Sequence, residues 1–113
     1  MHEMGIAQSI LDIAVEAARS HQAARVTGVK VRIGQITGVD PEALAFGFTA
    51  LSAGTIAQGA SLTIETVPAS GCCRECRHEF SFTVQRFFCP ECGSAGIEIL
   101  SGRELQVEHV EVD

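Results

Sequence analysis

Four cysteines arranged in two pairs constrain this chain more than any other feature of its sequence. Cys73 and Cys76 form the first Cys-x-x-Cys pair, and Cys89 and Cys92 form the second. Two such pairs can place four thiolates around one tetrahedral ion, usually zinc. Gly93 suits the tight backbone that follows the second pair. Because four cysteine ligands leave no open coordination position, we expect a structural metal rather than a catalytic one.

The fifth cysteine, Cys72, leaves one position of this ligand set open. We expect a free thiol beside the site, but Cys72 could also replace Cys73 and give a Cys-x₃-Cys spacing. His78 follows Cys76 by two residues and could replace a thiolate, although a solvated loop histidine is the simpler interpretation. Four of five cysteines in metal spacing indicate a reducing compartment, and hence the cytoplasm, rather than a disulfide framework.

Charge and composition exclude several classes of protein. The chain has 113 residues and a net charge of −6, from 14 acidic and 8 basic residues, which disfavours binding to a phosphate backbone. No apolar run approaches the ~20 residues that span a membrane, and no signal peptide is visible. There is no Ser/His/Asp set and no Gly-rich phosphate loop, so we expect a protein that is not an enzyme.

Hydrophobic periodicity predicts an α+β fold, in which two helices pack on a three-stranded, mainly antiparallel sheet with an inserted four-cysteine, zinc-ribbon-like module. The predicted elements are a helix over 4–22, a strand over 26–36, a helix from the N-cap Asp40 to Gly54, a strand over 60–67, the zinc segment over about 70–96 and a strand over 103–112. The chain returns to the sheet after the zinc segment. We therefore expect an α+β domain over 1–69 plus 97–113, and a structural zinc-binding module over 70–96.

Aromatic residues are concentrated inside the zinc segment. Four of the six phenylalanines lie between the two cysteine pairs, namely Phe80, Phe82, Phe87 and Phe88. We expect them to give the module a miniature core of its own.

The N-terminus offers a second candidate metal site. The terminal amine, the nearby backbone amides and the imidazole of His2 form a nitrogen-rich set that suits Ni(II) or Cu(II). The simpler interpretation is that His2 is solvated and that Glu3 stabilises the positive end of a helix. Asp40 is explained by its role as an N-cap, worth ~1 kcal/mol, and ligation of a metal by its second oxygen is compatible with that role.

Three stretches together resemble the HypA/HybF family of nickel metallochaperones of NiFe-hydrogenase maturation. They are Met1-His2-Glu3-Met4, the Gly-x-Asp-Pro-Glu run over 38–42, and the Cys-x₂-Cys…Cys-Pro-x-Cys-Gly-Ser module. The resemblance covers nearly the whole chain. Cys72 is not part of the family pattern.

The resemblance implies two metals and a set of partners. Nickel, as transient cargo, would be bound by His2 with the N-terminal backbone of Met1, assisted by Glu3 and Asp40. Structural zinc would be held by the four paired cysteines, Cys73, Cys76, Cys89 and Cys92. The implied partners are a HypB-type GTPase and the hydrogenase large subunit, and some family members also serve urease. Both a monomer and a homodimer are compatible with the sequence.

The spacing of the four paired cysteines is also compatible with two other functions. A zinc-ribbon interaction module of a nucleic-acid or transcription complex has the same spacing, but the acidic net charge and the absence of a basic stripe oppose it. A rubredoxin-like electron carrier is the other, because the Cys-Pro-x-Cys-Gly run also suits an iron centre.

Overall fold

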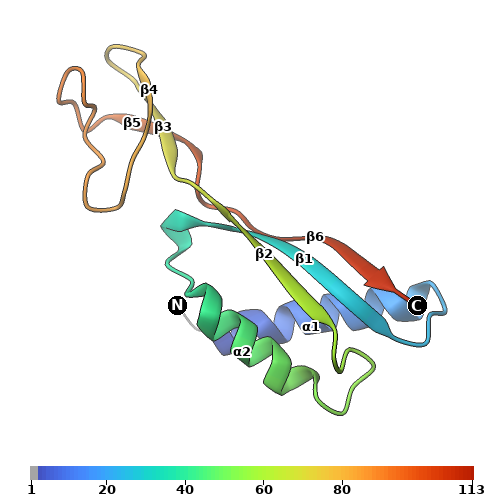
Figure 1. Ribbon diagram of the computed structural model, residues 1–113. Coiled ribbons are helices and arrows are strands. Elements are labelled where there is room, and N and C mark those ends of the chain that lie inside the picture. The colour runs from blue at the N-terminus through green and yellow to red at the C-terminus, as the bar shows by residue number, and fades with distance from the viewer. Residues whose placement is uncertain (1–2) are drawn as a thin grey trace. The chain divides into compact units, whose positions relative to one another are not determined.

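The computed structural model describes residues 3–113, and Met1 and His2 lie outside the described residues. Its elements, in chain order, are α1 (Glu3–Ser20), β1 (Val26–Gly34), the 3-10 helix η1 (Gln35–Thr37), α2 (Pro41–Ser52), β2 (Ser61–Val67), β3 (Ser70–Cys73), β4 (Glu79–Ser81), β5 (Ile97–Ser101) and β6 (Leu105–Val112) (Figure 1). The predicted α+β class, with two helices and an inserted cysteine module, is confirmed.

The strands form two three-stranded sheets, with orders β2-β1-β6 and β4-β3-β5. In the first sheet β1 and β6 run antiparallel, since Gly34 N–H bonds the Glu104 carbonyl at one end and Asp113 N–H bonds the Arg25 carbonyl at the other. In the second sheet β3 is antiparallel to both of its neighbours.

Strands β1 and β2 run in the same direction. The connection between them contains α2, which returns the chain to the end of the sheet at which β1 begins (Figure 1). Ser61 at the start of β2 lies close to Gly28, and Glu65 further along β2 bonds Arg32 further along β1. The strand pairing of the two sheets is therefore mainly antiparallel, as predicted, with one parallel pair.

The chain divides into two compact units. The helical unit comprises the described residues up to Arg32, together with Val39–Glu65 and Gln106–Asp113. The cysteine unit comprises Ile33–Gly38 and Thr66–Leu105.

The core of the helical unit follows the predicted periodicities. Both helices cover the same face of the sheet (Figure 1), and Val29 and Val31 of β1 are buried while Lys30 between them is half-exposed. The buried residues of the two helices are Ala7, Ile10, Leu11, Ala14 and Ala18 of α1, and Leu44, Gly47, Phe48 and Ser52 of α2. Gly47 lets the helices approach closely, because a Cβ at that position would lie 2.7 Å from the Met4 sulfur.

The opposite face of this sheet is charged. Lys30 Nζ lies 3.4 Å from Glu65 and 3.6 Å from Glu108, and Arg32 Nε donates to Glu65 over 3.1 Å. The Arg32 hydrogen bond holds the pKa of Glu65 below its usual value. This face is thus polar and half-exposed, as the alternation along β1 predicts.

Two local expectations were wrong. The strand predicted over 26–36 ends at Gly34, and the chain continues as η1. Gly34 packs directly on the backbone of Gly102, where a Cβ would overlap the carbonyl group, so only glycine fits at this point. The expected miniature phenylalanine core forms only in part. Phe80 and Phe82 are half-buried, whereas Phe87 and Phe88 are 44% and 56% exposed.

The two phenylalanines of α2 allow a matched test of this packing. Phe48 is 1% exposed and Phe46 is 74% exposed on the same helix. We expect Phe48→Ala to lower the free energy of unfolding by about 3–5 kcal/mol, because it opens a cavity, and Phe46→Ala to change it by less than about 0.5 kcal/mol. Urea denaturation of both variants measures this, and equal losses would contradict the assigned core.

Candidate metal centre

The four paired cysteines converge in the cysteine unit. Their sulfur atoms all lie within 4.8 Å of one another. The Cys73 and Cys92 sulfurs are 3.5 Å apart, and the Cys76 and Cys89 sulfurs are 3.6 Å apart. Among the described residues this is the one cluster of His, Cys, Asp or Glu side chains close enough to hold a metal ion.

The two cysteine pairs use the same backbone geometry. Arg77 N–H bonds the Cys73 carbonyl over 2.9 Å, and Gly93 N–H bonds the Cys89 carbonyl over 2.8 Å. Both donor residues are in the left-handed region, with φ of 67° at Arg77 and 77° at Gly93. Cys73 N–H then bonds the His78 carbonyl, as Cys89 N–H bonds the Ser94 carbonyl, each over 2.9 Å. Each of these two equivalent turns therefore carries one buried and one exposed cysteine, and the four sulfurs converge on a common centre.

Sequence reasoning identified Gly93 for this geometry and missed Arg77. A non-glycine residue at positive φ costs roughly 1–2 kcal/mol, and nothing in the residue type of Arg77 predicts that conformation. The signal was available only by analogy, since Arg77 stands four positions after Cys73 as Gly93 does after Cys89.

The thiols differ in their affinity for protons. The backbone amide of Cys76 hydrogen-bonds to the Cys73 sulfur and lowers the pKa of Cys73 to about 6. The amide of His78 favours the Cys76 thiolate, but desolvation and the neighbouring sulfurs outweigh it and raise the pKa of Cys76 to about 12. The pKa of Cys92 is raised as well: the Ser94 amide favours its thiolate, and the Cys73 sulfur and desolvation oppose it. Cys73 therefore ionises readily, whereas Cys76 and Cys92 need a cation beside them.

The donor set fits a tetrahedral metal ion. Zinc–sulfur bonds of about 2.3 Å place the sulfurs of a tetrahedron about 3.8 Å apart, close to the spacings of the two short sulfur pairs. Four soft thiolates select zinc or an iron centre over magnesium or calcium. All four positions are taken by protein, so the site offers a substrate no coordination position.

Cys72 and His78 lie outside this cluster. The Cys72 sulfur faces the carbonyl oxygens of Cys73 and Arg77, at 3.8 and 3.6 Å. The His78 ring stacks on Phe80, and its Nε2 lies 4.0 Å from Glu91. The structure therefore places Cys73, rather than Cys72, among the four converging sulfurs.

A second polar constellation lies in the helical unit, where α2 begins. The Asp40 side chain accepts from the amides of Glu42 and Ala43, over 3.0 and 3.4 Å, and thereby caps the helix. The amide of Asp40 itself donates to Glu3 Oε2 over 3.0 Å. Two residues with carboxylate side chains, 37 positions apart in the sequence, are thus brought together. The other predicted nickel ligands, Met1 and His2, lie outside the described residues.

Comparisons with known proteins agree along the whole chain. The family model described as hydrogenase/urease nickel incorporation, metallochaperone, hypA matches residues 1–112. A hydrogenase maturation factor HypA from Geotalea uraniireducens is 43% identical over 113 residues, and one from Geobacter sulfurreducens is 41% identical over 115 residues; all of both chains is covered in each case.

Solved structures share the fold. The solution structure of the nickel metallochaperone HypA from Helicobacter pylori superposes with a TM-score of 0.67 at 24% identity, covering 99% of this chain and 97% of that one. A second HypA solution structure gives a TM-score of 0.72 at 24% identity, with 100% and 97% coverage.

The adjacent cysteines provide a direct test of the ligand set. We expect Cys73→Ser to lose the stoichiometric metal ion, because it removes a buried sulfur from the cluster, and Cys72→Ser to keep one metal ion per chain. Metal analysis of the two purified variants decides the question, and metal loss in Cys72→Ser would show that the ligands are misassigned.

Proposed function

This chain belongs to the HypA family of metallochaperones for hydrogenase and urease nickel incorporation, and we propose that it binds Ni(II) at its N-terminus and delivers it during NiFe-hydrogenase maturation. The observation that carries this proposal is the family match over residues 1–112. A maturation factor of this kind is not an enzyme, and its task is to bind a metal ion and release it.

We assign nickel to the terminal amine and backbone of Met1, the imidazole of His2, and the carboxylates of Glu3 and Asp40. The hydrogen bond between the Asp40 amide and Glu3 supports this assignment, because it ties the first described residue of the chain to the start of α2. A nitrogen-rich set with nearby carboxylates suits the preferences of Ni(II).

Release of the ion is part of a carrier's task. Two of the ligands that we assign lie among the described residues and are held by hydrogen bonds of the protein. Asp40 is held by its cap and Glu3 by the Asp40 amide.

We propose zinc as the resident ion of Cys73, Cys76, Cys89 and Cys92. Bound there, the ion would cross-link the two turns. The chain's own residues fix the direction of the sulfurs through the paired amide–carbonyl bonds of the two turns.

A carrier needs partners at both ends of the transfer. We propose that a HypB-type GTPase and the hydrogenase large subunit are those partners, with urease maturation proteins as further partners. We also propose a cytoplasmic location, because a site built from thiols needs a reducing compartment. Within residues 3–113, neither α1 nor α2 has the length and hydropathy of a membrane-spanning helix.

The nickel site can be tested apart from the cysteine cluster. We expect His2→Ala to abolish stoichiometric Ni(II) binding while zinc stays at one ion per chain. His109→Ala serves as the matched control, because His109 is exposed on β6, and it should leave both metals unchanged. Calorimetric titration that found unaltered nickel affinity in the His2 variant would refute the assignment.

The two proposed roles of Asp40, helix capping and nickel ligation, can be tested separately. Asparagine caps helices about as well as aspartate, so Asp40→Asn should leave the free energy of unfolding within about 0.5 kcal/mol of wild type. If the carboxylate also ligates nickel, the same variant should bind Ni(II) at least about tenfold more weakly. Unchanged nickel affinity would restrict Asp40 to capping.

A further inference from the structure

The segment Phe82–Pro90 of the cysteine unit carries three exposed large apolar side chains, those of Val84, Phe87 and Phe88. Thr83 and Arg86 form a bridge that closes a tight turn. Val84 at the turn is 55% exposed. The Phe87 and Phe88 rings stack with centroids 5.0 Å apart and planes 18° apart, so each ring orders the other in solvent. Clustered exposed apolar side chains of this kind mark interaction surfaces.

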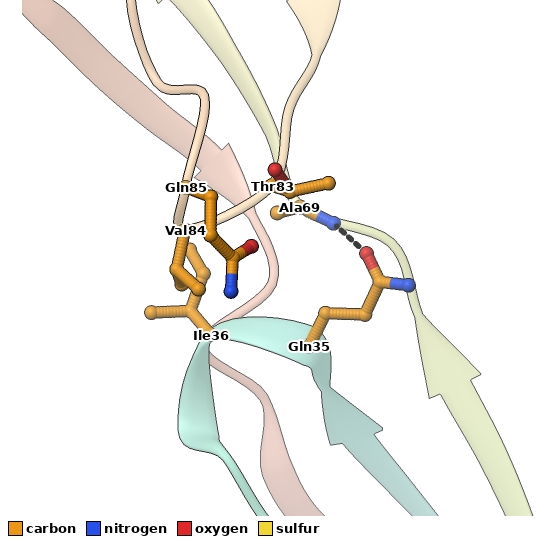
Figure 2. Close-up of a pocket in the computed structure, with 6 residues that line it drawn as sticks. All are labelled: Gln35, Ile36, Ala69, Thr83, Val84 and Gln85. Carbon is orange, nitrogen blue, oxygen red and sulfur yellow. Dashed lines mark hydrogen bonds between the residues drawn. The ribbon is translucent and has the colours of Figure 1, made fainter.

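Grooves flank this segment. One groove of about 200 Å³ is lined by Ile36, Phe82, Val84, Phe87, Ile97 and Ile99. Another, of about 420 Å³, is lined by residues that include Phe80, Gln85, Arg86, Phe88 and Pro90. A pocket of about 190 Å³ shares Ile36 and Val84 with the first groove, and Gln35 lies on its other side (Figure 2). The grooves offer separate places for successive side chains of a bound segment.

The backbone around these grooves is held in place before any partner arrives. Gln35 Oε1 accepts from the Ala69 amide over 3.1 Å (Figure 2), and Phe82 N–H bonds the Ala69 carbonyl over 3.0 Å. At the other end, Cys89 belongs to the sulfur cluster. A surface ordered in this way loses little conformational entropy on binding.

The charge of the larger groove indicates what binds there. Arg86 is the only charged residue between Glu79 and Glu91 in the sequence. Among the described residues, no carboxylate lies within ion-pair distance of its guanidinium group. Arginine and aromatic side chains are enriched at the centres of protein interfaces. An unpaired arginine between phenylalanines favours a carboxylate carried on an apolar segment.

We propose that the grooves on both sides of Val84–Phe88 receive an apolar segment of a partner protein, with an acidic side chain of that segment paired to Arg86. The chain's net charge of −6 disfavours the alternative of single-stranded nucleic acid stacked on the phenylalanines. The proposal does not involve the nickel site. An experiment can therefore refute it without refuting the proposed delivery of nickel.

The test uses the full-length, zinc-loaded protein and a displayed library of random heptapeptides as the probe. We expect enrichment of peptides in which an acidic residue adjoins apolar ones. Synthesised peptides should bind Arg86→Gln about fivefold more weakly than wild type. They should bind Arg103→Gln unchanged, because that substitution removes the same charge from an exposed residue that lines none of these grooves.

A second variant separates docking from misfolding. Phe88→Ser should keep one zinc per chain, because the ring is more than half exposed, and should bind the selected peptides at least about tenfold more weakly. No enrichment, enrichment without acidic residues, or equal binding to wild type and Arg86→Gln would each overturn the proposal. Binding of a uridine octamer that is lost in Phe88→Ser, or dimerisation lost in the same variant, would overturn it in favour of nucleic acid or a second copy.

Discussion

Four sulfur atoms within 4.8 Å of one another cannot all be anionic unless a cation lies among them. The conformation of the cysteine unit depends on that constraint. Cys73 is poised as a thiolate by a backbone amide, whereas Cys76 keeps its proton until a metal displaces it. The apolar segment Val84–Phe88 lies in the chain between the two cysteine pairs.

The second polar group, at Glu3 and Asp40, offers oxygen ligands instead of sulfur. Its described part consists of two carboxylate residues, Glu3 and Asp40, linked through one backbone amide. Among the described residues, this pair of carboxylates has no member in common with the cluster of four sulfurs. A closed set of soft ligands retains its ion, whereas nitrogen and oxygen ligands suit a different, borderline ion. The proposed function uses this difference: one metal would be kept for shape and another carried as cargo, with selectivity set by the type of ligand.

Local features of the sequence predicted local features of the structure. The cysteine spacing predicted the sulfur cluster, the alternation along β1 predicted its buried face, and the Asp-Pro-Glu run at Asp40 predicted the start of α2. Long-range contacts were not predictable in this way. The bond from the Asp40 amide to Glu3 and the close approach of Gly34 to Gly102 depend on the packed chain. The exposure of Phe87 and Phe88 was missed because clustered aromatic residues usually indicate a core.

The proposed function requires that the two metals occupy sites of different chemistry. X-ray absorption spectroscopy at both metal edges, on protein loaded with one zinc and one nickel ion, distinguishes the two sites. We expect four sulfur neighbours of zinc at about 2.3 Å, and only nitrogen and oxygen neighbours of nickel. Sulfur bound to nickel, or fewer than four sulfurs bound to zinc, would refute the assignment of the two sites.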